Sequence, residues 1–352
     1  MSSPVVAIAL SGGVDSLVSG FLIKKAYKNV FGIHFTTGYE VTPTDVKALE
    51  NQLGFPVHSI NLASVFEEKV VQYFISTYLE GKTPNPCVIC NQQIKFGALL
   101  EKAMEMGADA LATGHYATIV NPLSFPDGHI SNGHISNSWL EKATDLTKDQ
   151  SYFLSLLESS QLEKIILPLA GYTKATVKLL AKENHLIPTT PGESQDICFI
   201  QDTDFSQFII KKTRIVPKSG PIKDIHGKIV GTHQGLHAFT IGQRRGLNCP
   251  ASEAYYVRHI DLATNTLVVC FKQDLAQAKM QVENIIWNYS DTQEKSTITT
   301  KIRYSHKGAA SHLLRNGRTG QVTFDDPQLA ITPGQAAVFY EGNRVLGAGI
   351  IQ

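Results

Sequence analysis

The segment at residues 11–16, SGGVDS, limits the possible folds of this chain more than any other feature. It follows the apolar run at residues 5–10, and residues 14 to about 27 have the pattern of a helix. A buried strand, a glycine-rich turn and a helix start therefore follow one another. Two adjacent glycines let backbone N–H groups converge on an anion, and a helix N-terminus adds partial positive charge. The sequence predicts a phosphate-binding loop here.

The side chains of this loop indicate which kind of phosphate site it forms. Ser11 and Ser16 can donate hydrogen bonds to phosphate oxygens, whereas Asp15 suits a turn or a Mg²⁺ ion. No Gly-Lys-Ser/Thr follows, which excludes the Walker-type loop with its phosphate-reaching lysine. The segment resembles the PP-loop of the ATP pyrophosphatases, which bind ATP and release pyrophosphate to leave an adenylated substrate. The resemblance implies adenylation followed by displacement.

The composition predicts a soluble globular protein without a membrane partner. The chain has 352 residues, 43% of them hydrophobic and 18% charged, enough for two or three domains. No apolar run approaches the ~20 residues of a membrane span, and the first strand starts too early for a signal peptide. Five cysteines, two of them in Cys87-x-x-Cys90, indicate reactive or metal-binding thiols rather than a disulfide framework. We therefore expect a cytoplasmic protein.

The net charge of +1 hides a polarity along the chain. Residues 211–318 hold 17 lysines and arginines against 7 aspartates and glutamates. A basic segment joined to a more acidic ATP-binding part indicates a polyanionic macromolecular substrate. A solvated basic face is the alternative interpretation of the same composition.

The pattern of the elements predicts an α/β protein in three parts. Strand-like and helix-like runs alternate over the first 120 residues, which predicts a parallel sheet with helices on both faces and ligands at the carboxyl ends of the strands. Beyond residue 205 the runs are short and β-like, and after residue 282 they predict a small β-barrel. We expect a PP-loop ATP-binding catalytic domain at residues 1–205, a small β-rich central domain at 206–276 and a C-terminal β-barrel domain at 277–352.

Local signals add more specific expectations. Thr42 resembles an N-cap, with Pro43 at the first helical position, and helices are expected over residues 152–157 and 174–184. Residues 121–138 are polar and contain a duplicated GHISN, which predicts an exposed loop, because its two histidines lack further metal ligands.

Three cysteines stand in contexts that can carry chemistry. Cys87 and Cys90 lie just ahead of a helix expected at about residues 92–106, so the helix dipole favours a thiolate, and a low pKa, at Cys90. Two small buried hydrophobes, or half of a zinc site, are the alternatives. Cys198 by itself has the context of a core cysteine on a β-like run, and the remaining two cysteines have no polar context.

The order of motifs gives a resemblance over almost the whole chain. The motifs are SGGVDS (11–16), NPCVICN (85–91), ATGHY (112–116), KDQSYFL (148–154), Cys198, HQGL (233–236), TIGQRRGL (240–247), KIRY (301–304) and TPGQAAVFY (332–340). In this order they resemble the tRNA-specific 2-thiouridylase family (MnmA, or TrmU in mitochondria). The resemblance implies the family's architecture of a PP-loop domain, a small central domain and a C-terminal β-barrel.

The resemblance also implies a role for each matched residue. Cys90 would be the nucleophile, and Cys198 would carry a persulfide and later form a disulfide with Cys90. The target base, uridine 34 at the wobble position of the anticodon, would face Asn85, Pro86 and Cys87. ATP, with Mg²⁺, would be held by Ala9, Leu10, Ser11, Gly12, Gly13, Val14, Asp15, Ser16, Phe35 and Gly114. The tRNA would also contact His115, Lys148, Asp149, Gln150, Arg303, Tyr304 and Gln335.

The implied reaction has a coherent physical basis. The C2 oxygen of uracil is a poor leaving group, and transfer of AMP onto it, driven by pyrophosphate release, makes it a good one. The persulfide sulfur of Cys198, or hydrosulfide released from it by Cys90, then attacks C2, which requires thiolates. The base must leave the anticodon stack to react. The resemblance implies tRNAs for Lys, Glu and Gln, and a cysteine desulfurase or a sulfur-relay protein as the sulfur donor.

The chain departs from the family pattern at Cys87. The best-known members have an aspartate there, proposed as the acid or base beside the nucleophile. Cys87 either serves as the base in its thiolate form or is only a neighbour. Three thiols, Cys87, Cys90 and Cys198, can also hold a [4Fe–4S] cluster with one iron open to sulfide, as in some other tRNA thiolases that resemble this superfamily. Cluster-based thiolation is therefore an alternative mechanism.

Two other functions share part of this pattern. A different PP-loop ligase, acting on a small molecule, would use SGGVDS but leave the three thiols and the basic segment without a role. A non-catalytic tRNA-binding protein that has kept an ATP fold would not need Cys90 and Cys198.

Overall fold

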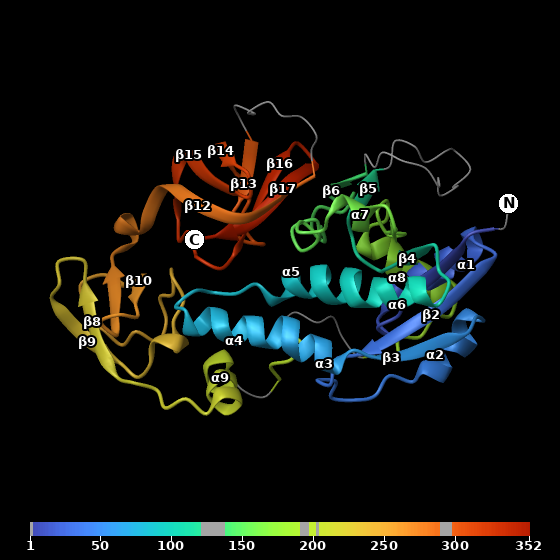
Figure 1. Cartoon of the computed structure of the whole chain (residues 1–352), viewed down its shortest axis with the longest axis horizontal. Helices are drawn as coiled ribbons and strands as arrows, with labels where there is room; N and C mark the ends of the chain where they lie inside the picture. The colour runs from blue at the N-terminus through green and yellow to red at the C-terminus, as the bar shows by residue number, and fades with distance from the viewer. Residues whose placement is uncertain (1–2, 121–137, 191–196, 202–203, 289–297) are drawn as a thin grey trace.

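A five-stranded parallel sheet forms the centre of the N-terminal part of the protein (Figure 1). The computed structural model describes residues 3–120, 138–190, 197–201, 204–288 and 298–352. In the order β3-β2-β1-β4-β7, the strands are β3 (Val57–Asn61), β2 (Asn29–Thr36), β1 (Val5–Ala9), β4 (Ala110–Ala112) and β7 (Ile165–Ile166). The centre of β1 is fully buried, as expected for a parallel strand covered on both faces.

Helices cover both faces of this sheet because alternate residues of β1 point to opposite sides. Val6 and Ile8 belong to the core with α1 (Val14–Ala26), α2 (Val46–Leu53) and α8 (Lys174–Glu183). Ala7 belongs to the core on the other face, with α3 (Ala63–Phe66), α4 (Gln72–Leu79), α6 (Leu99–Glu105) and α7 (Ser159–Leu162). The expected parallel sheet with helices on both faces is confirmed.

Two long helices on the second face each contain a π-helical stretch. The first joins α3 and α4 through η1 (Glu67–Val71), and the second joins α5 (Pro86–Cys90) and α6 through η2 (Asn91–Ala98). They run side by side across the middle of the molecule (Figure 1), and α5 contacts η1. The stretch from α5 to α6 is called the cysteine helix below.

The cysteine helix begins earlier than the sequence pattern suggested. The expected start near residue 92 is wrong, because Pro86 occupies the first helical position and the Asn85 side chain accepts a hydrogen bond from Val88 N at 3.4 Å. Asparagine as N-cap followed by proline is a strong start signal. Cys87 and Cys90 therefore lie within the helix, not ahead of it.

Other local expectations had mixed outcomes. The helix that Thr42 was expected to cap begins at Val46 instead, because Asp45 accepts a hydrogen bond from Ala48 N at 2.9 Å. Residues 152–157 form successive turns rather than a helix, since their backbone bonds span three residues, as from Leu157 N to Leu154 O. The helix expected at 174–184 is confirmed as α8. The expected loop at 121–138 lies almost wholly outside the described residues.

A small β-rich unit follows the N-terminal part. It begins with α9 (Phe205–Thr213) and has a four-stranded sheet in the order β10-β11-β8-β9. These strands are β8 (Gly220–Asp224), β9 (Ile229–His233), β10 (Tyr256–Asp261) and β11 (Thr266–Cys270), with short 3-10 turns η3 (Leu236–Ala238) and η4 (Lys272–Leu275). Ile222, Val257, Leu267 and Val269 form its separate core.

The C-terminal strands close into a six-stranded antiparallel barrel, so the expected fold class is confirmed. They are β12 (Ala276–Trp287), β13 (Ile298–Lys301), β14 (Ala309–Asn316), β15 (Thr319–Leu329), β16 (Ala336–Glu341) and β17 (Arg344–Ile351). A hairpin from the N-terminal part, β5 (Thr118–Val120) and β6 (Trp139–Glu141), extends the barrel sheet through pairing of Arg344 with Glu141. None of the helices in the described parts of the chain has the length and apolar character that crossing a membrane requires.

Candidate active site

The glycine-rich loop lies at the carboxyl end of β1 and leads into α1. Gly12 has a φ of +84°, a left-handed conformation that favours glycine, and a Cβ there would collide with the Thr189 hydroxyl. Thr189 N donates to Gly12 O at 2.9 Å, and Ser16 Oγ donates to Gly13 O at 2.8 Å. Hydrogen bonds within the loop and from Thr189 therefore fix its conformation.

This loop fits the phosphates of a nucleotide. No side chain caps the N-terminus of α1, so its first N–H groups are left for a ligand. Gly114, after β4, lies against the loop so closely that a Cβ would come within 2.9 Å of Ser16 N. The buried Thr189 hydroxyl has no hydrogen-bond partner among the described residues. An anionic phosphate bound here would supply the hydrogen-bond acceptors that the free N–H groups and the Thr189 hydroxyl lack, and the close backbone approach at Gly114 forms one side of the loop's surroundings.

Asp15 is already engaged by its neighbours. Lys174 Nζ lies 2.8 Å from Oδ1 and 2.6 Å from Oδ2, and the Tyr116 hydroxyl donates to Oδ1 at 2.7 Å. Lys174 is largely buried, with a side-chain exposure of 10%. In this arrangement both carboxylate oxygens are occupied, and Asp15 could bind Mg²⁺ only if Lys174 moved aside. Sequence reasoning missed Lys174 because it lies far from the loop in the chain.

The fold brings together the three cysteines that the motifs selected. Cys87 and Cys90 lie one helical turn apart on the cysteine helix, and the charges of Cys87 and Cys198 act on the Cys90 thiol. Cys198 is exposed, so its interpretation as a core cysteine is wrong. The residue after it, Phe199, is the buried one, with its ring against several aromatic side chains: Tyr39, Phe66, Phe74 and Phe208.

Burial governs the ionisation of these thiols. It raises the pKa of Cys90 to about 12, and the neighbouring thiols add to that rise. The predicted low pKa of Cys90 is therefore wrong, because Cys90 lies a turn inside the helix, where loss of hydration outweighs the dipole. Cys87 and Cys198 reach solvent, but the surrounding protein removes enough of their hydration to raise the pKa of each thiol as well.

Lys95 is the cation that opposes this rise at all three thiols. Its charge lowers the pKa of Cys87, Cys90 and Cys198 relative to burial alone. Lys95 Nζ lies 3.3 Å from His115 Nε2, and no acidic side chain within the described residues lies at ion-pair distance from it.

The π-helical stretch explains why Lys95 was not found from the sequence. Residues five apart, such as Cys90 and Lys95, lie on different faces of a regular α-helix. In η2 the hydrogen bonds span five residues, so these two residues come close to one face. No periodicity in the sequence signals this change.

His115 is buried beside this group and is held neutral. The Lys95 ammonium can only donate, so Nε2 accepts from it, and Nδ1 carries the proton and donates to Thr113 Oγ1 at 2.8 Å. Burial, with Lys95 nearby, lowers the pKa of His115 well below its usual value. The expected contact of His115 with tRNA stays a prediction, and the ring is 8% exposed in this arrangement.

The predicted [4Fe–4S] alternative finds no matching set of ligands. In the described parts of the chain, no three His, Cys, Asp or Glu side chains are arranged to hold a metal ion. The three thiols are close enough to influence one another but are not placed as a cluster site. No step is therefore derived through a cluster.

Three of the residues expected to contact tRNA, Lys148, Asp149 and Tyr304, lie near one another where the N-terminal part meets the barrel. The charges of Lys148 and Asp149 act on the phenol of Tyr304, which is 41% exposed. Asp149 is itself buried and accepts from Ala143 N, and Gln150 Oε1 accepts from Tyr116 N. Both side chains thus also hold the turn that they occupy.

Gln335 ties the barrel to the segment before the cysteine helix. Its amide donates to Thr83 O at 3.1 Å and to Pro84 O at 2.9 Å. Next along the chain, Asn85 N donates to the Tyr73 hydroxyl at 3.3 Å. The predicted target-base residues therefore begin at a point that the barrel positions.

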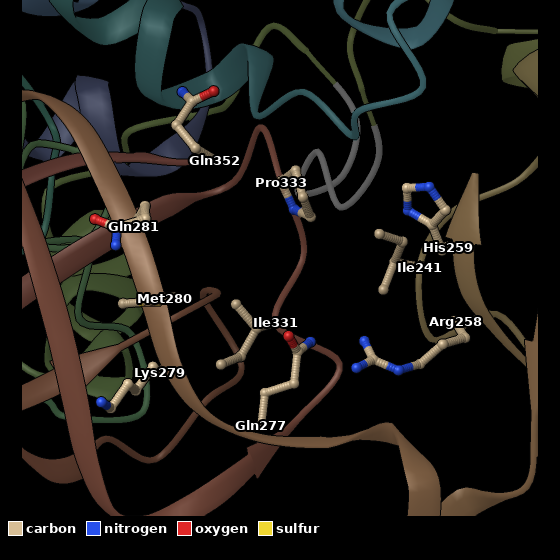
Figure 2. Close-up of a pocket in the computed structure, with 10 residues that line it drawn as sticks. All are labelled: Ile241, Arg258, His259, Gln277, Lys279, Met280, Gln281, Ile331, Pro333 and Gln352. Atoms are coloured by element: carbon tan, nitrogen blue, oxygen red, sulfur yellow. The ribbon is translucent and has the colours of Figure 1, made fainter. Parts of the chain in front are cut away.

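A cavity of about 630 Å³ lies beyond this tie, between β10, β12 and the segment before β16. Figure 2 shows Arg258 extending across it toward Gln277, with Ile331 and Pro333 along the inner side. Among the residues that the structure describes, no acidic side chain lines this cavity. None of the three thiols belongs to its described lining.

Comparisons with known proteins agree with this arrangement. Family models match successive parts of the chain: a tRNA methyl transferase HUP domain (4–202), a tRNA methyl transferase PRC-barrel domain (207–271) and an aminomethyltransferase β-barrel domain (277–351). The tRNA-specific 2-thiouridylase MnmA of Desulfosudis oleivorans is 43% identical over 100% of this chain and 96% of its own. The tRNA-specific 2-thiouridylase MnmA of Moorella thermoacetica is 38% identical over 98% of each chain.

Among solved structures, a predicted subunit of a tRNA methyltransferase from Methanocaldococcus jannaschii is 19% identical over 60% of this chain and 88% of its own. Its TM-score of 0.32 is too low to carry an argument. The three family models follow one another in the same order as the sheet, the small β-rich unit and the barrel. Together with the full-length relatives, they show that this chain belongs to the tRNA-specific 2-thiouridylase (MnmA) family.

Proposed function

We propose that this protein is a tRNA sulfurtransferase that converts the wobble uridine 34 to 2-thiouridine at the expense of ATP. The observation that carries the proposal is the presence, in one fold, of a nucleotide-type loop and a group of three thiols. The relatives' name, 2-thiouridylase, supports the same activity. A ligase acting on a small molecule would leave Cys87, Cys90 and Cys198 without a role.

In the first proposed step, ATP binds as a substrate at the loop of residues 11–16. The N–H groups of the loop and the start of α1 would bind its phosphates, with Phe35 and Gly114 near the nucleotide. The C2 oxygen of the uridine attacks the α-phosphorus and pyrophosphate leaves. The C2 oxygen is then bonded to AMP, so it can leave C2 as part of AMP when the C2–O bond breaks. Asn85, Pro86 and Cys87 would face the base during this step.

In the second proposed step sulfur is delivered by Cys198. The terminal sulfur of its persulfide attacks C2, and AMP leaves with its electron pair. The Cys90 thiolate then attacks Cys198 Sγ, so that the S–S bond to the transferred sulfur breaks and a Cys90–Cys198 disulfide forms. Release of hydrosulfide by Cys90 before the attack on C2 is the variant of this route, and a cellular thiol reduces the disulfide afterwards.

The remaining expectations follow from this chemistry. The sulfur that loads Cys198 would come from a cysteine desulfurase or a sulfur-relay protein, and the tRNAs for Lys, Glu and Gln would be the substrates. Residues 1–205 would carry the chemistry, while residues 206–276 and 277–352 would bind tRNA. The protein would act in the cytoplasm, where these partners meet.

Mass spectrometry of digested nucleosides tests the proposal directly. The purified protein is incubated anaerobically with unmodified tRNA, Mg-ATP, cysteine and a cysteine desulfurase. We expect 2-thiouridine with the wild type and with Cys249→Ser, a thiol remote from the site, but not with Cys198→Ser or without ATP. Cleavage of ATP to AMP and pyrophosphate in the absence of tRNA, with no thionucleoside, would overturn it.

A further inference from the structure

Two aromatic rings from distant parts of the chain stack where the N-terminal part meets the barrel. The ring centroids of Phe153 and Tyr304 lie 4.5 Å apart, with the planes inclined by 33°. The fully buried ring of Tyr152 lies edge-on to Phe153 at 5.6 Å. Lys301 Nζ lies over Tyr304 at 5.7 Å from its centroid. Tyr304 is thus supported by one ring and one cation.

Tyr304 stands out because it keeps an exposed surface. It is 41% exposed, and no other Phe, Tyr or Trp in the described parts of the chain is exposed to this degree. Phe153, which supports it, is half-buried. An aromatic ring that its neighbours hold in place and that keeps an exposed surface is preorganised to receive another flat ring.

The position of this pair connects it to the candidate active site. Tyr152, beside both rings, donates to Ala336 O at 3.0 Å, and the Asn85 side chain lies near enough to this hydroxyl to lower its pKa relative to burial alone. Arg303 precedes Tyr304, and the charge of Lys148 acts on the Tyr304 phenol. Aromatic faces surrounded by cations are how proteins bind unpaired bases of RNA.

We propose that Phe153 and Tyr304 form a stacking platform for one unpaired nucleobase of the RNA, adjacent in sequence to the target uridine. This inference rests on the proposed function, since it takes RNA to be the substrate. Tyr304 presents its exposed surface to the base, and Phe153 is a positioning residue that holds the Tyr304 ring. A neighbouring base anchored here leaves the uridine itself free to reach Asn85.

The test uses anticodon stem–loop RNAs in which 2-aminopurine replaces the nucleotide on one side or the other of the wobble uridine, one replacement per RNA. Stacking on an aromatic side chain quenches this base, so fluorescence and affinity are measured together on the full-length protein. We expect quenching at one position with the wild type, and loss of that quenching with Tyr304→Leu. The affinity should fall about 5- to 150-fold, the range for loss of one base–aromatic stack.

Matched variants separate stacking from mere packing. Tyr304→Phe keeps the ring and should keep both quenching and affinity, whereas Phe153→Leu should weaken both. His58→Leu breaks another ring contact, with Phe31 at 5.8 Å in the N-terminal sheet, outside the residues expected to bind tRNA, and should leave RNA binding unchanged. Melting temperatures of all variants show whether each is folded.

The outcomes distinguish the two proposals. If the wild type thiolates tRNA but Tyr304→Leu and Phe153→Leu keep wild-type affinity and quenching, the platform is overturned and the proposed function stands. If the wild type neither binds the RNA nor thiolates tRNA, both are overturned.

Discussion

At the scale of single residues, the balance between burial and one lysine decides whether the candidate nucleophile can react. Burial raises the pKa of Cys90 to about 12, so at neutral pH the group is almost entirely a thiol. Only the thiolate attacks a sulfur or carbon centre. Lys95 favours the charged form, and its removal can only raise the pKa of this thiol further.

We therefore predict that Lys95→Met shifts the alkylation of Cys90 to higher pH. Iodoacetamide modifies the thiolate, so the rate at Cys90, followed by peptide mass spectrometry, should rise with pH later in the variant than in the wild type. Lys95→Arg keeps the charge and should restore much of the wild-type profile. Lys102→Met, on the same helix and paired with Glu105 at the surface, is the matched control. Equal profiles for Lys95→Met and Lys102→Met would contradict the role given to Lys95.

The roles of residues were predictable where a short motif alone determines the local conformation. SGGVDS predicts a phosphate loop because glycine, hydroxyl and helix start are local requirements. The ionisation of Cys90 was not predictable, since it depends on how the helix from α3 to α4 packs against α5. Lys174 and Lys95 escaped prediction for the same reason: one reaches its partner across the fold, and the other depends on a π-helical stretch.

At the scale of elements, one glycine positions the barrel against the start of the cysteine helix. Gly334 has a φ of +91°, and a Cβ there would lie 2.6 Å from Thr83 O. Thr83 N in turn donates to Pro333 O at 2.8 Å. The two backbones touch with no room for a side chain.

We predict that Gly334→Ala destabilises the protein and lowers thiolation, whereas Gly342→Ala does much less. Gly342 also has a positive φ, of +59°, but a Cβ there would meet nothing within 4 Å. The control should therefore cost about 1–2 kcal/mol for backbone conformation alone. Gly334→Ala should cost a further ~1–3 kcal/mol because the Cβ overpacks against Thr83. Urea unfolding measures both, and equal losses would show that the contact with Thr83 is unimportant.

Elements were predictable where their pattern is local, and connections between them were not. The alternation of strand and helix predicts the parallel sheet, and the late run of short strands predicts the barrel. The hairpin of β5 and β6 joins that barrel through a single register pair, Arg344 with Glu141, between segments distant in sequence. The two strands have three residues each, too few for a periodic signal.

At the scale of the whole molecule, part of the basic stretch of the chain lies at one cavity. Arg258 and Lys279 belong to the basic stretch at 211–318, and both line the cavity between the central unit and the barrel (Figure 2). Its described lining includes amide side chains and cations but no acidic residue. A phosphate of a bound polyanion would find complementary charge there.

We predict that Arg258→Gln combined with Lys279→Gln weakens the salt dependence of tRNA binding. Each lost phosphate contact reduces the slope of log K against log salt by about 1, so the double variant should lose about 2. Lys47→Gln with Lys102→Gln changes the net charge equally at exposed lysines of the N-terminal part and should keep the wild-type slope. Filter binding over a range of salt measures the slopes. Equal slopes for the two double variants would contradict the prediction. They would mean that tRNA binding depends on the total charge of the protein and that no phosphate of the tRNA contacts Arg258 or Lys279 in this cavity.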